Sequence, residues 1–430
     1  MTVTVGELVA TKEAELTTGP FGTQLKAAEY VDSGVPVINV RNIGLGTIRE
    51  ADLEYIGENT VTRLSRHVLR TGDIVFGRKG AVERHAFIRD TEDGWFQGSD
   101  CLRLRLVSER YDSRFVSYCM LTDEHKQWMI NQGSHGSTMA SLNQGILFRI
   151  ALPDLPIAGQ HKIVAILSAY DDLIENNSRR IRIMEEMAQR IYHEWFLDFR
   201  YPGHGGVAFV DSELGLIPEG WEVHSVREVA RLVRGQSYRG TDVAECGGTP
   251  FVTLKCVDRG GGFRRDGIKA FTGQIHPDRT VSAGDIVVAV TDMTQERRIV
   301  ARAARVPLRD GVEAVMSMDL VKLEPRDIPS AFLLGMLRYS GFAEEVKQHA
   351  NGANVLHLHP DRILDYRFAV PPSRLLASYA QVADNTVQLE DALGTLQDSL
   401  RTARDLLLPR LISGEIDVDD LDIPTGESAA

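Results

Sequence analysis

The chain has 430 residues, with 48 basic against 60 acidic side chains, a formal net charge of −12 and 43% hydrophobic residues. This length is too great for one ordinary hydrophobic core, so we expect two or three domains of a soluble globular protein. No apolar run is long enough to form a transmembrane helix, and the first ten residues lack the basic and apolar regions of a secretory signal. These features predict a cytoplasmic protein without a membrane partner.

Cysteine spacing excludes two common kinds of site. The four cysteines are Cys101, Cys119, Cys246 and Cys256, and no two of them stand in C-x-x-C spacing. The sequence therefore encodes neither a zinc knuckle nor a redox pair of that type. We expect four reduced structural thiols in a reducing compartment.

The acidic total hides an uneven distribution of charge. Residues 63–89 hold seven basic residues against two acidic ones, and residues 255–305 hold ten against six. The segment 413–430 carries six acids and no base. Because local charge decides whether a phosphate backbone is attracted, the two basic segments leave a nucleic-acid partner open. The alternative is that they form an ordinary solvated surface.

Short β-branched runs separated by glycines predict strands at residues 35–40, 73–76 and 101–107. A short helix is expected at 113–129, followed by a loop rich in Gly, Ser and Asn at 133–143 and then by a long helix. The second half repeats this order, with strands at 251–256, 285–290 and 318–323, a helix at 329–348 and a loop at 351–354.

The repeated order reflects an internal duplication. Residues 69–75 (LRTGDIV) reappear as residues 281–287 (VSAGDIV), and residues 150–153 (IALP) return as residues 368–371 (FAVP). In both copies a Gly-Asp pair precedes an apolar run, which predicts a tight turn entering a strand. Two copies are too few for a solenoid, so the pattern indicates a duplicated domain pair.

Each copy ends in a long helix whose apolar residues alternate in steps of four and three for more than four heptads. The first seam is Ile163, Leu167, Tyr170, Ile174, Asn177, Ile181, Met184, Ala188, Ile191 and Trp195. The second seam is Leu375, Tyr379, Val382, Thr386, Leu389, Leu393, Leu396, Leu400, Ala403 and Leu407. This period is typical of a coiled coil, and the equal lengths, roughly 50 Å at about 1.5 Å per residue, indicate that the two helices pair. The alternative is that each helix packs only on its own domain.

Pairing has a geometric consequence for a nucleic-acid partner. Two domains joined by such a helix pair would stand tens of Å apart around an approximate two-fold axis. One turn of B-DNA is about 34–36 Å long, so the protein could contact two half-sites across an unread spacer. Because the two copies differ in sequence, we expect the half-sites to differ too.

Several segments resemble one known family, the specificity subunits of type I restriction–modification enzymes. The segments at residues 19–25 (GPFGTQL) and 34–40 (GVPVINV) resemble the start of that family's target recognition domains, and residues 216–221 (LIPEGW) resemble a second entry. Residues 195–199 (WFLDF) and 408–416 (LPRLISGEI) resemble its helix terminations. No single motif is diagnostic, but their order covers essentially the whole chain. The first copy departs from the pattern, because residues 2–18 lack the Ile-Pro-x-Gly-Trp entry.

The resemblance implies an α+β fold. Two pseudo-two-fold-related target recognition domains, each a mixed, twisted β-sheet with short helices, would be separated by a pair of long antiparallel coiled-coil helices. The expected boundaries are recognition domain 1 at 1–155, the first spacer helix at 156–200, a linker at 201–217, recognition domain 2 at 218–371, the second spacer helix at 372–412 and an acidic tail at 413–430.

The resemblance also implies partners. Each domain would recognise one half of an asymmetric bipartite site in double-stranded DNA, and the helices would dock two methyltransferase (modification) subunits, which a motor-nuclease (restriction) subunit then joins. S-adenosylmethionine, ATP and Mg would be bound by those partner subunits, with no cofactor on this chain.

The residue types that contact base edges and phosphates indicate candidate DNA contacts near the ends of the predicted strands. In the first copy these are Arg41, Asn42, Arg78, Lys79, Arg84, His85, His135 and Ser137. In the second copy they are Lys255, Arg259, Arg264, Arg265, Gln295, Arg297, Arg298, Asn351 and Asn354. For any one of them, a solvated surface side chain is the alternative.

Signatures of catalysis are missing from the sequence. It contains no Asn/Asp-Pro-Pro-Tyr methyltransferase motif and no G-x-x-x-x-G-K-[ST] phosphate loop. We therefore expect a subunit that is not an enzyme alone but belongs to a site-specific deoxyribonuclease and adenine DNA methyltransferase complex. Two alternatives stay open: a coiled-coil scaffold with two protein-binding modules, and a methyltransferase or nuclease with an unrecognised active site.

Overall fold

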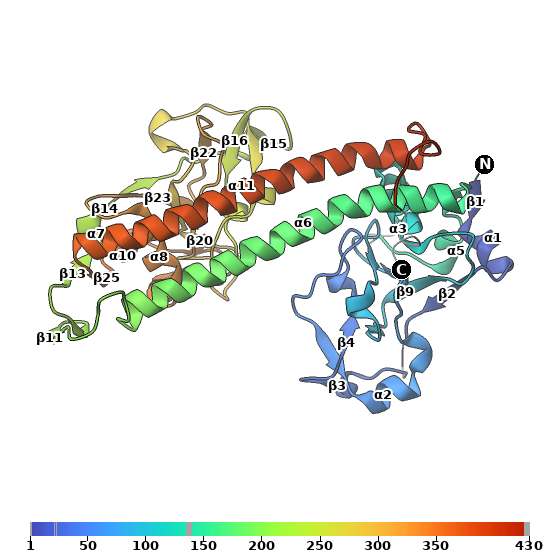
Figure 1. Cartoon of the computed structure of the whole chain (residues 1–430), viewed down its shortest axis with the longest axis horizontal. Coiled ribbons are helices and arrows are strands. Elements are labelled where there is room, and N and C mark those ends of the chain that lie inside the picture. The colour runs from blue at the N-terminus through green and yellow to red at the C-terminus, as the bar shows by residue number, and fades with distance from the viewer. Residues whose placement is uncertain (1, 21, 23, 135–139, 425–430) are drawn as a thin grey trace. The chain divides into compact units, whose positions relative to one another are not determined.

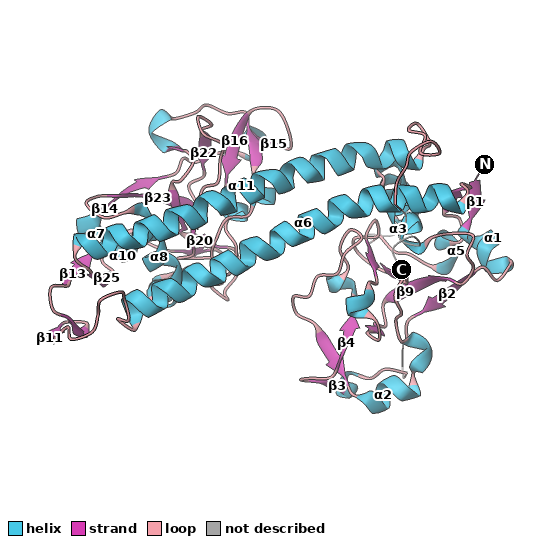
Figure 2. Ribbon diagram, in the orientation of Figure 1, coloured by secondary structure: helices cyan, strands magenta, loops and turns pink. Residues whose placement is uncertain are grey.

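Two long helices dominate the computed structural model, which describes residues 2–20, 22, 24–134 and 140–424 (Figures 1 and 2). Helix α6 spans Ile157–Tyr192 and ends in one π-helical turn at His193–Leu197, and helix α11 spans Ser373–Ile412. The chain divides into two compact units: unit 1 comprises Met1–Asn176 with Gln397–Ala430, and unit 2 comprises Asn177–Leu396. Each unit therefore contains one globular domain and a segment of both long helices.

The domain of unit 1 has two four-stranded sheets. One is antiparallel, in the order β2 (Ala14–Thr18), β9 (Cys101–Leu106), β6 (Ile74–Gly77) and β7 (His85–Phe87). The other runs in the order β3 (Tyr30–Val31), β5 (Glu54–Ile56), β4 (Val35–Ile38) and β8 (Phe96–Gln97), with β4 and β8 parallel. Strand β1 (Thr2–Thr4) pairs with β10 (Ala151–Pro153). The helices are α1 (Val5–Ala10), α2 (Glu58–Arg63), α3 (Ser113–Leu121), α4 (Asp123–Gly133) and α5 (Gln144–Leu147).

The domain of unit 2 repeats this arrangement. Its antiparallel sheet has the order β14 (Ala230–Arg234), β23 (Leu320–Pro325), β19 (Ile286–Ala289) and β21 (Ala303–Arg305). The second sheet has the order β15 (Val243–Ala244), β17 (Lys269–Phe271), β16 (Thr249–Val252), β22 (Ala314–Met316) and β18 (Thr280–Val281), with β16 and β22 parallel. Three strand pairs complete it: β11 (Phe209–Ser212) with β12 (Gly215–Pro218), β13 (Glu222–Ser225) with β25 (Arg367–Val370), and β20 (Thr291–Asp292) with β24 (Leu356–His357). Its helices are α7 (Val226–Val229), α8 (Ser330–Tyr339), α9 (Phe342–Val346) and α10 (Asp361–Leu364).

The entry segment of the first copy has a counterpart in the second, although the sequences differ. Strand β1 leads into α1 through a capping box between Thr4 and Glu7, and β13 leads into α7 through the same device between Ser225 and Glu228. A capping box satisfies two free N–H groups at a helix start, which fixes the turn between strand and helix. The α+β fold and the duplication expected from the sequence are therefore confirmed.

The short helices differ from the sequence prediction, because each is two helices. The predicted helix at 113–129 breaks at Thr122, whose side chain accepts a hydrogen bond from the backbone N of His125 and so caps α4. The predicted helix at 329–348 breaks at Ser340, in extended conformation, before α9. A Thr or Ser within an apolar run offers the backbone an alternative partner, which favours a break there.

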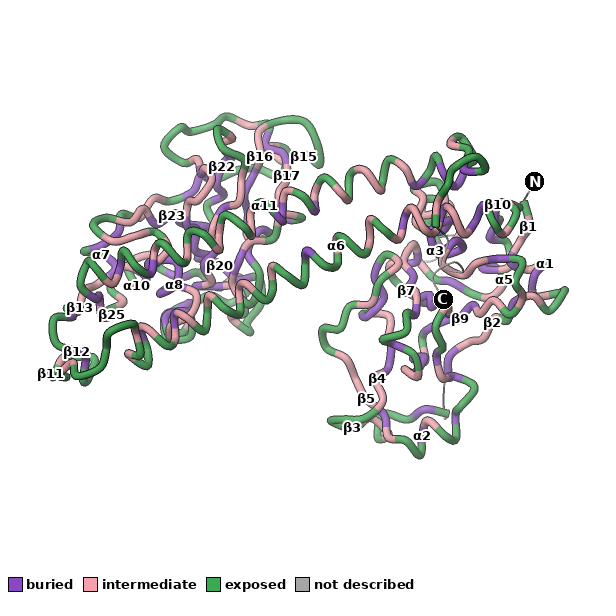
Figure 3. Tube along the Cα trace, in the orientation of Figure 1, coloured by how far each residue is buried: buried purple, intermediate pink, exposed green. Residues whose placement is uncertain are grey.

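Each unit completes its hydrophobic core with both long helices, as the buried segments in Figure 3 indicate. In unit 1, Ile163 and Leu167 of α6 and Leu411 of α11 join Phe115 of α3 in one buried cluster. In unit 2, the buried cluster that includes Phe332 of α8 and Trp221 also contains the helix residues Tyr192, Phe196, Leu376 and Tyr379. Within each unit the two helices run antiparallel, since later residues of α11 pair with earlier residues of α6.

The buried face of α6 contains the predicted residues, with Ile163, Leu167 and Asn177 buried and Tyr170, Ile174, Ile181, Met184, Ala188, Ile191 and Trp195 partly buried. On α11 the predicted seam is displaced by one residue at three positions and kept at the others. Val382, Leu389 and Leu396 are 40%, 46% and 47% exposed, whereas Leu393 is buried and Leu400 and Leu407 are partly buried.

Polar side chains with specific partners explain the displacement on α11. Gln397 lies inward and donates from Nε2 to the carbonyl oxygen of Ile174 at 2.9 Å. Arg404 also lies inward, and its Nη1 is 2.7 Å from Oδ1 of Asp171. Hydrogen bonds and an ion pair of this kind compensate the desolvation of the polar groups. Gln397 therefore occupies an inward position, and Leu396, one position earlier, faces outward.

Among the residues that the structure describes, no helix combines the length and apolarity needed to cross a membrane. The four cysteines are free thiols, of which Cys246 alone is exposed.

A partly buried carboxyl group on α11 in unit 2, that of Glu390, yields a prediction about pH. Burial, together with the negative charges of Glu185 and Asp391, raises the pKa of Glu390 from 4.5 to about 7, although Arg338 and Arg305 oppose the shift. A carboxyl whose folded pKa is raised contributes stability that is complete below its ordinary pKa and is lost as the pH rises through 7.

We expect Glu390→Gln to raise the free energy of unfolding at pH 8 by about 1–3 kcal/mol and to change it little at pH 4.5. Thermal unfolding of both proteins across this pH range measures the difference. The exposed neighbour Glu186 provides the control, since Glu186→Gln should leave the pH dependence as it is. Equal pH dependence in wild type and Glu390→Gln would contradict the assignment.

Candidate nucleic-acid interface

In the domain of unit 1, three loops meet where strands β6 and β8 end. The backbone N of Arg78 donates to the carbonyl oxygen of Asp100 at 2.8 Å, and the N of Leu142 donates to the oxygen of Arg78 at 2.8 Å. Lys79 also bridges to Ser141. The loop after β6, the loop between β8 and β9 and the segment before α5 therefore form one surface, with the Lys79 side chain exposed on it.

The corresponding loops meet in the domain of unit 2. The backbone N of Val290 donates to the oxygen of Asp319 at 2.9 Å, and the N of Leu358 donates to the oxygen of Val290 at 2.8 Å. The two domains thus use the same backbone bonds to assemble a surface from three segments far apart in sequence, and the side chains on those segments differ.

A glycine at the start of each surface allows a close backbone approach. A Cβ on Gly19 would lie 2.0 Å from the carbonyl oxygen of Gly98, and a Cβ on Gly235 would lie 2.0 Å from that of Ser317. Any other residue would push the first loop away from the loop that follows β8 or β22. This contact gives a physical reason for the glycine that opens the GPFG segment.

A buried carboxylate organises the loop after β20. Asp292 Oδ2 accepts from the backbone N of Ile299 at 2.7 Å, and Oδ1 accepts from the N of Thr294 at 2.9 Å. Burial alone would raise the pKa of Asp292, but these hydrogen bonds, with one from the N of Val300, lower it below its ordinary value. Gln295 adds a bond from Nε2 to the oxygen of Ala353 at 3.0 Å. The loop is therefore held at both ends and at its middle.

Four of the first-copy candidates are buried or already paired with another residue of the domain, which leaves them less available to a DNA duplex. Arg41 is exposed but pairs with Glu54 at 3.0 Å, and Arg84 is partly buried beside Glu83 at 3.5 Å. Asn42 is buried and donates to the carbonyl oxygens of Arg49 and Ala51. His85 is buried against the Ser117 hydroxyl at 2.7 Å, and burial lowers its pKa to about 3. His135 and Ser137 lie outside the described residues. The placement of Asn42 and His85 at the interface is therefore corrected: both side chains are satisfied inside the domain and hold its fold.

The second-copy candidates divide into exposed residues and engaged ones. Lys255, Arg259, Asn351 and Asn354 are exposed, and Arg264 and Arg298 are exposed beside Asp266 and Glu296. Arg297 takes a positive φ of 52° and its guanidinium donates to Gln348 and to the oxygen of Ala350. Arg265 lies against α11, with its Nη2 3.8 Å from Asp391, so its assignment as a DNA contact is corrected. A sequence pattern could not distinguish an arginine that docks a domain on a helix from one that faces solvent.

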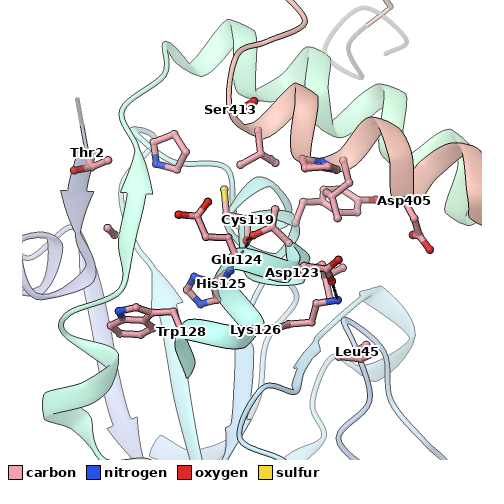
Figure 4. Close-up of a pocket in the computed structure, with 18 of the residues that line it drawn as sticks. Thr2, Leu45, Cys119, Asp123, Glu124, His125, Lys126, Trp128, Asp405 and Ser413 are labelled. Atoms are coloured by element: carbon pink, nitrogen blue, oxygen red, sulfur yellow. Dashed lines mark hydrogen bonds and ion pairs between the residues drawn. The ribbon is translucent and has the colours of Figure 1, made fainter. Parts of the chain in front are cut away.

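A cavity of about 620 Å³ lies in unit 1 between α4, β1 and the end of α11 (Figure 4). Its lining mixes apolar side chains such as Trp128 with charged ones such as Glu124 and Lys126. Burial lowers the pKa of His125 to about 4, which leaves the imidazole neutral. Within the described ranges no group of three His, Cys, Asp or Glu is placed to hold a metal ion.

Comparison with known proteins finds similarity to one family. Residues 22–185 match the model of the type I restriction modification DNA specificity domain. The chain is 23% identical over 417 residues to the type I restriction enzyme MjaIX specificity subunit of Methanocaldococcus jannaschii, covering 92% of this chain and 90% of that protein. It is 20% identical over 370 residues to the MjaVIII specificity subunit of the same organism, covering 81% of this chain and 77% of that protein.

A solved structure agrees with these sequence relatives. The S subunit of a type I restriction–modification system from M. genitalium superposes with a TM-score of 0.56 at 15% identity, covering 96% of this chain and 95% of that one. At this identity the likeness concerns the fold. The resemblance drawn from the sequence is thereby confirmed: the chain is similar to the specificity subunits of type I restriction–modification enzymes, and residues 22–185 match the model of a DNA specificity domain of that kind.

Proposed function

We propose that this chain is the non-catalytic subunit that selects the DNA site of a type I restriction–modification complex, each domain recognising one half of an asymmetric bipartite site. The observation that carries this proposal is the repeated three-loop surface. Equivalent backbone bonds assemble it in both domains, with Arg78 and Lys79 in the first copy where Val290 and Thr291 stand in the second. A shared frame with different side chains supports recognition of two different half-sites.

The charge of the exposed loops supports a duplex as the ligand. Lys79 in the first domain, and Lys255 and Arg259 in the second, are exposed cations in segments with a local excess of base. Cations placed along a phosphate backbone release condensed counterions, which provides affinity and sets the register. The negative charge of the whole chain does not oppose this, because the segment 413–430, with six acids and no base, contributes half of the net charge of −12.

The long helices are proposed to set the spacer and to dock the modification subunits. Helix α6 has 36 residues, which corresponds to about 54 Å at 1.5 Å per residue. Val382, Leu389 and Leu396 stand one heptad apart on α11 and are exposed. A stripe of exposed apolar side chains on a helix favours a protein partner. On this proposal, S-adenosylmethionine, ATP and Mg belong to the modification and motor-nuclease subunits.

The basic pair of the first domain provides a test. Replacing Arg78 and Lys79 together by alanine should weaken binding or relax discrimination at one half-site only, and should lower the salt slope of binding by up to about two units. Competition binding with duplexes altered in one half-site at a time measures both effects. The control replaces Arg179 and Arg180, an adjacent exposed pair on α6, by alanine. This variant should discriminate at both half-sites as the wild type does. Unchanged binding to both half-sites in the double alanine variant would refute this placement.

The Asp292 loop provides a second test, directed at the other domain. Asp292→Ala leaves the backbone N–H groups of Thr294, Ile299 and Val300 without their acceptor, and that of Val300 is buried. We therefore expect a loss of about 1–3 kcal/mol in stability and relaxed recognition of the second half-site. Thermal unfolding and the same competition assay measure these changes. Asp310→Ala removes an exposed carboxylate from the same domain and should change neither. Discrimination at the second half-site equal to that of wild type would argue against a role for this loop.

A further inference from the structure

Two methionines of the second domain are unusually exposed. Met293 and Met318 have 69% and 55% of their surface exposed, although methionine side chains are usually buried. Tyr238, 37% exposed, also lies in this domain. We call Met293, Met318 and Tyr238 the methionine patch.

Hydrogen bonds bring the three parts of the methionine patch together. Thr291 donates from its hydroxyl to Oδ1 of Asp319 at 3.0 Å, so the loop of Met293 is tied to the residue after Met318. The backbone N of Met318 donates to the oxygen of Gln236 at 2.8 Å, which places Met318 beside the segment of Tyr238. The negative charge of Asp319 also raises the pKa of Tyr238, after the larger effect of burial.

The backbone under the patch is held rigidly. Besides the Asp292 bonds, the side chain of Gln236 donates to the oxygen of Gln274 and accepts from the N of His276, both at 3.0 Å. The ring of Tyr238 packs on Phe251 at 4.9 Å between centroids. The methionine side chains therefore project from loops whose backbone is held by hydrogen bonds, and this backbone conformation keeps the two side chains exposed.

In the part of the chain that the structure describes, the first domain exposes no methionine at the corresponding surface. The Gly19–Gly98 and Gly235–Ser317 contacts align the two surfaces, so Ser99 occupies the position of Met318. Lys79, which bridges to Ser141, occupies the position of Thr291, which pairs with His357. The backbone arrangement is thus repeated in both domains, but the methionine patch is not. Such a difference is expected of residues that distinguish one half-site from the other.

We propose that Met293 and Met318 contact thymine 5-methyl groups in the major groove, so that the half-site bound by the second domain contains T·A pairs. This inference rests on the proposed function. The thymine methyl is the one apolar group that base pairs present on the major-groove edge. A thioether side chain is apolar and adaptable, so it suits contact with a methyl group whose exact position varies. Arg298, which is exposed on the loop that follows Met293 and stands beside Glu296, supplies a cation for a phosphate near such a contact.

Replacing thymine by deoxyuridine removes only the methyl group and so tests the contact directly. The full-length chain, assembled with its modification subunit, first selects duplexes from a randomised pool to define both half-sites. Deoxyuridine is then placed at each thymine of the second half-site. Because burying one methyl group contributes about 0.8 kcal/mol, we expect about a fourfold loss of affinity for each methyl contact.

The variants assign the effect to the patch. Met293→Ala with Met318→Ala should bind thymine and deoxyuridine duplexes equally and should keep the wild-type melting temperature. Met187→Ala, which alters a methionine 54% exposed on α6, should keep the fourfold difference, as should the wild type. A second half-site without thymine on either strand would overturn the inference. A difference in affinity between thymine and deoxyuridine duplexes that persists in the double variant would also overturn it. The same holds if the double variant binds DNA as the wild type does but no longer assembles with the modification subunit. Absence of any sequence-selective binding would overturn the proposed function, and this inference with it.

Discussion

The structure depends on one packing constraint: neither recognition domain completes its hydrophobic core without both long helices. Ile163, Leu167, Leu408 and Leu411 belong to the core of unit 1, while Tyr192, Phe196, Leu376 and Tyr379 belong to that of unit 2. These helix segments come from distant parts of the sequence, so the folding of each domain is coupled to pairing of the helices. Truncating one such residue to alanine would cost about 2–5 kcal/mol. The helix pair is thus part of each domain and not a passive linker.

The sequence predicted the helices, their lengths and the buried face of α6, because a sustained heptad alternation constrains all three. It was wrong by one residue at three positions of α11. There, leucine spacing alone favoured Val382, Leu389 and Leu396, which the structure places outward. The inward positions include Gln397 and Arg404, and these become favourable only through Ile174 and Asp171 of the other helix. Such partners are tertiary and leave no periodic signal in either helix.

The candidate site was predictable in outline and not in detail. The order of strands and loops placed Arg78, Lys79, Gln295 and their neighbours on the loops that the backbone brings together. Asn42 and His85 carry the right chemistry for DNA, but their partners lie within the domain. The sequence did not indicate Met293 and Met318 as candidates, because apolar residues are expected in the core. Whether a side chain is exposed, and which residues it contacts, depends on the whole fold and therefore could not be predicted from the sequence.

The molecule combines a repeated backbone arrangement with two unlike sets of exposed side chains, and on this basis we propose that the chain selects one asymmetric, interrupted DNA site. Sequencing the methylated bases of the host genome with and without this gene tests that claim most directly. Loss of a single methylation motif made of two unlike parts, separated by a gap of fixed length and free sequence, is the predicted result. An unchanged methylation pattern, or loss of an uninterrupted or symmetric motif, would contradict it.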